Sequence, residues 1–205
     1  ISSKAQGSCL LDLSGDPRPD RRARPPVPEG RVNIRANLAV NGDERSTLLV
    51  GGPNELDAHL AHKLAAYILF WDYAPLLDAS VKTPTLADYE FLPDLLALDD
   101  AGEGRLWVEC GTTTLHKLTK ITRRMPRARL VIMKETERDA ARLRKDLEAQ
   151  FDRPEKVEIL AWPGDSFKQW VRLVAGRTEA FGEASGHMIN AVVNDVPVLV
   201  EFKPY

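Results

Sequence analysis

The stretch FLPDLLALDDAGEGRLWVECGTTT, residues 91–114, contains the features that decide the fold. Two apolar runs, residues 90–98 and 105–110, flank a short polar turn, and this pattern predicts two adjacent strands. Each predicted strand carries one carboxylate: Asp94 lies inside the first strand, and Glu109 ends the second. A carboxylate among apolar residues is costly unless it is paired or binds a metal, so these two residues are candidates for a functional site.

Two carboxylates on paired strands can converge on one cation. Oxygen ligands from Asp94, Glu109 and a backbone carbonyl suit Mg²⁺ or Mn²⁺. Such an ion polarises a phosphodiester and lowers the pKa of a bound water. The alternative is that both residues are strand-end carboxylates that face solvent or form ordinary ion pairs.

The residues before this stretch indicate a hairpin and a helix. Alternating apolar residues over 32–40 predict a half-buried strand. Asn41-Gly42 predicts a hairpin turn, and residues 47–50 continue as the returning strand. Asn54 is expected to cap a helix that ends between residues 72 and 75.

The residues after this stretch alternate between helical and strand patterns. They predict a helix to about residue 125, a strand over 129–133, a helix over 136–151 that Thr136 caps, a strand over 157–162, a helix over 165–174, and a closing hairpin with strands 187–193 and 196–202. The whole order is ββ-α-ββ-α-β-α-β-α-ββ. This order favours an α/β fold with one mixed central sheet that has helices on both faces.

The first 30 residues differ from the rest in composition. Prolines at five positions between 17 and 28 disfavour a helix or an inner strand, and arginines lie between them. We therefore predict a flexible Pro/Arg-rich tail over 1–30, either a solvated extension or partly a cloning remnant, and one folded domain over 31–205. The alternative for the tail is that its arginines contact an anion.

The composition is that of an ordinary globular protein. The chain has 205 residues, of which 43% are hydrophobic and 28% charged. No apolar run approaches the roughly 20 residues that cross a bilayer, and the start of the chain has no apolar signal region. Its two cysteines, Cys9 and Cys110, fit no metal-binding or redox spacing, and a disulfide is not expected. These features predict a cytoplasmic protein without a membrane partner.

The charge is distributed unevenly along the chain. The net charge of −2 argues weakly against a protein that coats nucleic acid. However, residues 110–134 contain seven basic residues and no acidic one, whereas acidic residues precede them over 94–103. A site that binds a metal and a phosphodiester needs such a pattern. The alternative is that charged helix faces serve solubility.

The spacing of these carboxylates resembles a known nuclease signature. Pro93-Asp94, followed after 14 residues by Glu109-Cys110-Gly111, is similar to the PD-(D/E)xK motif. Residues 107–111, the lysine-bearing helix after them and Gly52-Pro53-Asn54-Glu55 resemble the YaeQ family, a branch of that nuclease-like superfamily. The resemblance covers residues 31–205 and implies a restriction-endonuclease-like core. Because the YaeQ family has no well-established reaction, it implies the fold more firmly than an activity.

The resemblance implies a metal site and its ligands. Asp94 and Glu109 would hold Mg²⁺ or Mn²⁺, and the carbonyl of Cys110 would be a third ligand. Glu55, expected in the first turn of the first helix, would be the helix carboxylate near the metal. The alternative for Glu55 is that the helix dipole favours an acidic residue there. His59, four residues after Glu55, would share a polar edge with it near the site.

The resemblance also implies a substitute for a missing lysine. The superfamily has a lysine two residues after the glutamate, where this chain has Gly111. The next helix would supply the charge, first from Lys120 and second from Lys117, although both could be ordinary surface lysines. Gly111, Thr112 and Arg124 would bind the substrate phosphate, whereas the threonines could also be helix caps.

Three functions are compatible with these residues. The first is a Mg²⁺-dependent nuclease or phosphodiesterase that acts on DNA or RNA. The second is a catalytically weak or inactive module of the same fold, which binds nucleic acid or a protein partner. The third is a structural domain in which the carboxylates are relics. The apolar surroundings of Asp94 and Glu109 favour the first function over the third.

Overall fold

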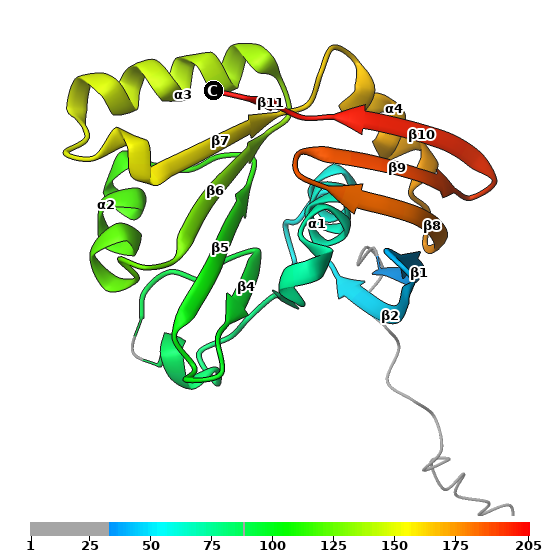
Figure 1. Cartoon of the computed structure of the whole chain (residues 1–205), viewed down its shortest axis with the longest axis horizontal. Coiled ribbons are helices and arrows are strands. Elements are labelled where there is room, and N and C mark those ends of the chain that lie inside the picture. The colour runs from blue at the N-terminus through cyan, green and yellow to red at the C-terminus, as the bar shows by residue number, and fades with distance from the viewer. Residues whose placement is uncertain (1–32, 88) are drawn as a thin grey trace, which may run out of the picture.

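The computed structural model describes residues 33–87 and 89–205, which form two β-sheets and four α-helices (Figure 1). The predicted tail over residues 1–30 lies outside the described residues. Our prediction of an α/β fold with mixed strands is confirmed, but the prediction of one central sheet is wrong. The strands form two separate mixed sheets, because a helix fills the space between them.

The five-stranded sheet combines both ends of the described chain. Its strand order is β10-β9-β8-β1-β2, with β1 and β8 parallel and the other neighbours antiparallel. The bounds are β1 Asn33–Val40, β2 Asp43–Val50, β8 Arg177–Ser185, β9 Met188–Val193 and β10 Val196–Glu201. The two predicted hairpins are therefore present, but β8 joins them into one sheet.

Strand β8 was not predicted from the sequence. Its inward-facing side chains include Thr178, Ala180 and Ala184, which are small and give a weak apolar alternation. Gly182 interrupts the pattern further. A Cβ atom at Gly182 would lie 2.3 Å from the carbonyl oxygen of Asn190, so this close approach of β8 and β9 requires glycine.

The six-stranded sheet carries the carboxylates that the sequence singled out. Its order is β11-β7-β6-β5-β4-β3, in which β5, β6 and β7 are parallel and the other neighbours antiparallel. The bounds are β3 Leu76–Leu77, β4 Leu95–Leu98, β5 Gly104–Cys110, β6 Arg129–Lys134, β7 Val157–Ala161 and β11 Lys203–Pro204. Strand β4 is shorter than predicted, and Asp94 directly precedes it.

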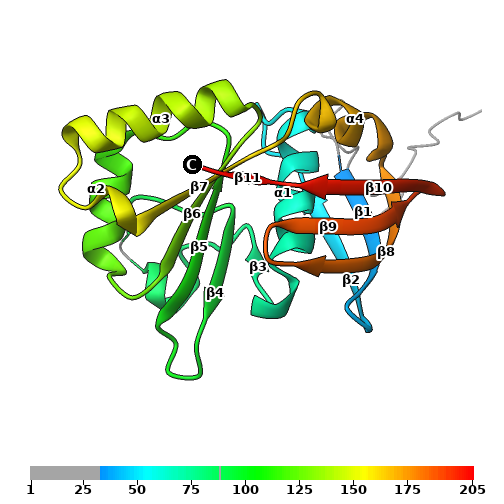
Figure 2. The same ribbon diagram turned by 45° about the horizontal axis from the view of Figure 1, so that its top comes forward.

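The helices occupy three positions around the sheets (Figures 1 and 2). The bounds are α1 Asp57–Leu69, α2 Leu115–Arg124, α3 Glu137–Gln150 and α4 Ser166–Leu173. Short 3-10 helices cover Trp71–Tyr73, Pro84–Leu86 and Pro154–Lys156. Helix α1 lies between the two sheets and packs beside α4, whereas α2 and α3 cover the outer face of the six-stranded sheet.

The position of α1 explains its composition. Every residue from Leu60 to Leu69 is buried, because α1 contacts a sheet on each side. A second apolar core lies on the other face of the six-stranded sheet, where Trp107 packs with residues of α2 and α3 such as Leu118 and Leu147. The six-stranded sheet is thus covered on both faces, and its central strand β5 is buried along most of its length.

The helix starts agree only in part with prediction. Thr136 caps α3, as predicted, by accepting a hydrogen bond from the amide of Asp139 at 3.1 Å. The predicted cap Asn54 is wrong: α1 begins at Asp57 without a side-chain cap. Residues 52–55 instead form a turn in which the amide of Glu55 donates to the carbonyl of Gly52. None of the helices in the described parts of the chain is both long and apolar enough to cross a bilayer.

Candidate functional site

The candidate site surrounds the carboxyl end of β5, between α1 and α2. The peptide N–H of Cys110 donates a hydrogen bond to Oδ2 of Asp94 at 2.7 Å, so Asp94 lies next to the peptide bond that follows Glu109. Side chains alternate along β5: Val108 and Cys110 face the α1 core, and Trp107 faces the α2 core. Glu109 bonds to Trp107 and to α2, so the two carboxylates flank one peptide group from different sides.

Glu109 is the more deeply buried carboxylate. It is 3% exposed, and its Oε1 accepts a hydrogen bond from the indole Nε1 of Trp107 at 2.7 Å. Its Oε2 accepts one from Nζ of Lys117 at 2.6 Å. Burial raises the pKa of Glu109, and the charge of Asp94 adds to this effect, while Lys117 and Trp107 oppose it. We call Trp107, Glu109 and Lys117 the Glu109 group.

The Asp94 carboxylate has two hydrogen-bond partners, His59 and the Cys110 amide. Its Oδ1 lies 3.1 Å from Nε2 of His59, and its Oδ2 accepts the Cys110 amide. Burial opposes ionisation of Asp94, but His59, the Cys110 amide and the charge of Lys63 outweigh it and lower the pKa. The same hydrogen bond raises the pKa of His59 above its ordinary value of 6.5.

Lys63 links Asp94 to two further carboxylates. Its side chain is almost fully buried, and its Nζ donates to Oε1 of Glu55 at 2.9 Å and to Oδ1 of Asp78. The distance from Nζ to Oδ1 of Asp94 is 3.9 Å. We call Glu55, His59, Lys63, Asp78 and Asp94 the Asp94 cluster.

The sequence analysis predicted only part of the Asp94 cluster. Glu55 and His59 do share a polar edge, with 3.4 Å between Oε1 and Nε2. Lys63 and Asp78 were not identified. For Lys63 a signal existed, since a lysine four residues after His59 lies on the same helical face inside an otherwise apolar segment. For Asp78 no signal existed, because it belongs to an irregular segment.

Glu55 lies in a different place from the predicted one. It precedes α1 rather than lying in its first turn, so the helix-dipole explanation does not account for it. Its Oε2 accepts a hydrogen bond from the amide of Gly52 at 2.9 Å. Burial raises the pKa of Glu55, but this bond and Lys63 outweigh burial and lower it.

Of the two predicted lysines, the structure places Lys117 beside Glu109. Lys120 points to solvent, where its Nζ lies 2.7 Å from Oε1 of Glu90 and its side chain is 45% exposed. The two lysines are three residues apart on α2 and therefore point in directions that differ by about 60°. This difference is sufficient for only Lys117 to reach the end of β5.

The predicted phosphate-binding residues are spread more widely. Gly111 directly follows β5 with a positive φ of 83°, which glycine adopts without strain. Its carbonyl accepts a hydrogen bond at 2.5 Å from Nζ of Lys134, a mostly buried lysine whose pKa is lowered by burial. Thr112 and Arg124 are exposed and have no side-chain hydrogen bond within the described chain. Thr114, rather than Thr112, caps α2.

The second histidine of α1 belongs to the core. His62 is fully buried against Trp162 and Phe167, and neither ring nitrogen has a partner within the described residues. Burial lowers the pKa of His62 to about 3, so its ring is neutral near pH 7.

The side chains near β5 are chemically suited to a hard cation but are already paired. Asp94, Glu109 and the carbonyl of Cys110 provide oxygen donors, which Mg²⁺ and Mn²⁺ prefer. Over residues 33–87 and 89–205, no three His, Cys, Asp or Glu side chains are grouped as a metal would require. His59 and Lys117 contact the two carboxylates, so a cation at this site competes with both side chains.

Comparisons with known proteins identify relatives of the chain. A family model described as YaeQ protein matches residues 42–183, which are 142 of the 205 residues. The chain is similar to the crystal structure of the YaeQ protein from Xanthomonas axonopodis pv. citri, with 18% identity and a TM-score of 0.64 over 84% of this chain and 97% of that chain. It is also similar to the YaeQ protein from Pseudomonas syringae, with 15% identity and a TM-score of 0.61 over 85% and 94%. None of the curated proteins that were compared matches the chain.

Proposed function

The chain belongs to the YaeQ family, and we propose that it hydrolyses phosphodiester bonds of DNA or RNA with a divalent cation at Asp94 and Glu109. The proposal includes the assignment of the six-stranded sheet, with α1 and α2, as a restriction-endonuclease-like core. One observation carries it: two mostly buried carboxylates, Asp94 directly before β4 and Glu109 in β5, flank one peptide group, and a lysine lies 2.6 Å from Glu109. A buried carboxylate is costly unless it is paired or binds a metal.

Each side chain of the site has a role in this proposal. Asp94, Glu109 and the Cys110 carbonyl would hold Mg²⁺ or Mn²⁺, which when bound polarises a phosphodiester and acidifies a water. Lys117 supplies the positive charge that the missing lysine at position 111 would otherwise bring. His59 keeps Asp94 oriented through its 3.1 Å contact.

Gly111 contributes space rather than charge. A Cβ atom at this position would lie 4.0 Å from Nδ1 of His59, so a longer side chain would extend into the region between β5 and the start of α1. With glycine there, the phosphate of a substrate can approach the carboxyl end of β5. Lys134, which donates to the Gly111 carbonyl, and Lys117, which donates to Glu109, would balance the charge of the phosphate.

A second function is favoured by a different observation. Lys117 and His59 already contact Glu109 and Asp94, so each of these two carboxylates has a basic partner from the chain itself. This arrangement supports a module that binds nucleic acid or a protein partner without cleaving it.

Cation binding distinguishes the two functions. We would titrate Mn²⁺ and Mg²⁺ into the folded chain by calorimetry and compare Asp94→Asn, Glu109→Gln and Lys117→Met. Hydrolysis predicts binding that both carboxylate substitutions abolish. It also predicts that Lys117→Met tightens cation binding, because the competing ammonium is removed, but lowers cleavage of DNA or RNA. Glu90→Gln is the control, since Glu90 pairs with Lys120 at the surface.

The absence of cation binding by the well-folded native chain would reject hydrolysis and leave the binding module. Binding that survives both Asp94→Asn and Glu109→Gln would place the cation elsewhere and reject the assigned ligands.

A further inference from the structure

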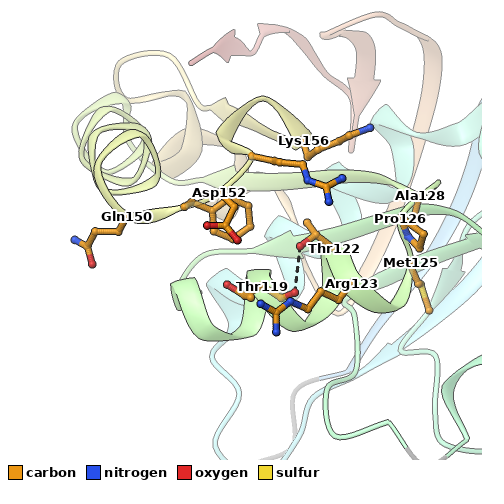
Figure 3. A pocket seen from close by; sticks show the side chains of 11 residues that line it. Thr119, Thr122, Arg123, Met125, Pro126, Ala128, Gln150, Asp152 and Lys156 are labelled. Carbon is orange, nitrogen blue, oxygen red and sulfur yellow. Dashed lines mark hydrogen bonds between the residues drawn. The ribbon is translucent and has the colours of Figure 1, made fainter.

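A second concave site lies at the opposite edge of the six-stranded sheet (Figure 3). It is a pocket of about 480 Å³ between α2, the turn before β6 and the segment that joins α3 to β7. It lies at the amino ends of β6 and β7, whereas the candidate site lies at the carboxyl end of the parallel strand β5. A six-residue strand is roughly 20 Å long, so the two sites are separate.

The pocket carries a surplus of positive charge. Three basic residues line it, Arg123, Arg153 and Lys156, together with one carboxylate, Asp152. None of these four side chains forms an ion pair with another part of the described chain. Three cations against one anion leave two positive charges. A phosphate monoester carries close to two negative charges at neutral pH, whereas a carboxylate ligand carries one.

The remaining walls indicate the rest of the ligand. The apolar part of the lining comes from Met125, Pro126 and Phe151, and Figure 3 shows Met125 beside Pro126. On the α2 side, the Thr119 hydroxyl donates to the carbonyl of Leu115 at 2.9 Å, and the Thr122 hydroxyl donates within α2 as well. Because their protons are used in the helix, both hydroxyl oxygens are left as acceptors for a ligand N–H or O–H.

We propose that this pocket binds a phosphate monoester with a flat apolar body and a hydrogen-bond donor, the chemistry of a nucleoside monophosphate. Arg123 and Arg153 bind the phosphate, because guanidinium groups match its oxygens in pairs. The apolar side contacts the flat body. A volume of about 480 Å³ lies within the range of small-molecule sites. The proposal does not depend on hydrolysis at Asp94 and Glu109.

Calorimetry with adenosine monophosphate tests the proposal on the full chain. We expect saturable binding that weakens by about tenfold or more in Arg123→Gln and in Arg153→Gln, since each change removes charge-assisted hydrogen bonds to the phosphate. Arg138→Gln is the matched control, because Arg138 is an exposed arginine of α3 that does not line the pocket. Its affinity should equal that of the native chain, as should that of Asp94→Asn.

Each side of the pocket has its own test. Adenosine and inorganic phosphate should both bind much more weakly than the monophosphate. Adenosine lacks the phosphate that the arginines bind, and inorganic phosphate lacks the flat body that the apolar residues contact. Equal affinity for inorganic phosphate would overturn the role of the apolar side. No binding of the monophosphate by the folded chain would overturn the proposal. Binding of a single-stranded oligonucleotide alone, lost in both arginine variants, would replace it with a nucleic-acid surface.

Discussion

The Asp94 cluster and the Glu109 group lie on different sides of the same strand end, and they accommodate a buried carboxylate differently. Asp94 has His59, a backbone amide and nearby Lys63, and its pKa is lowered. Glu109 has one lysine and one indole, and its pKa is raised by burial. Both side chains are mostly buried, so the number and kind of donors decide the direction of the shift.

The positions of the two helices explain this difference. Helix α1 is enclosed between two sheets, so a charged side chain such as Lys63 has to find all its partners inside the protein. Helix α2 covers an outer face, so only Lys117 reaches inward while Lys120 remains in solvent. An enclosed helix therefore produces a connected cluster, and an outer helix produces a single pair.

The largest expected effect tests the connected cluster. Lys63→Met removes the cation that Glu55 and Asp78 share, and leaves three carboxylates with His59 alone. Breaking a buried ion pair on one side destabilises a protein by several kcal/mol, so we expect a loss of about 3 kcal/mol in the free energy of unfolding. Urea denaturation at neutral pH measures it.

Lys120→Met is the control for this measurement. Lys120 and its partner Glu90 are both about half exposed, so this change should alter stability by no more than about 0.5 kcal/mol. Equal effects of the two substitutions would show that Lys63 is not held in a buried network.

A medium effect tests the single pair. Lys117→Met leaves Glu109 buried with only the indole of Trp107 as a donor, and should lower stability by about 1–3 kcal/mol at neutral pH. Adding Glu109→Gln should restore most of this loss, since the unpaired charge is gone. A double-mutant cycle by urea denaturation gives the coupling energy. Additive single losses would contradict the pairing of Lys117 with Glu109.

The smallest expected effect depends on pH. It distinguishes the two regions because the Asp94 cluster contains a histidine, His59, whereas the Glu109 group contains none. Asp94 raises the pKa of His59, so the charged ring stabilises the folded state. This contribution is fully present below the unfolded pKa near 6.5 and is lost as the pH rises through the folded pKa. Denaturation between pH 5.5 and about 8.5 should show this decline in the native chain.

The matched variant for the pH experiment is His59→Gln, which keeps a polar side chain but cannot titrate. The decline above pH 6.5 should be absent in this variant. A decline of the same size in His59→Gln would show that the titration of His59 beside Asp94 is not its cause. The effect is small because His59 is about a third exposed and water screens its charge.

Local patterns predicted those elements whose side chains differ clearly between the two faces. Three local patterns were sufficient to predict the first hairpin and the start of α3: the alternation over β1, the Asn41-Gly42 turn and the Thr136 cap. Strand β8 was missed, because its inward residues are small and Gly182 interrupts it. The division into two sheets was missed as well, since no local pattern states which strands become neighbours.

The sequence by itself determined that two carboxylates, Asp94 and Glu109, lie in apolar surroundings at a pair of strands. The residues around them also determined the family. Only the tertiary structure decided their partners. Lys63 lies near Asp94 and pairs with Asp78 because α1 is enclosed between two sheets. Lys117 rather than Lys120 reaches Glu109, because α2 turns the face that carries Lys117 toward the end of β5. Residue type and spacing are local properties, whereas a partner depends on how distant elements pack.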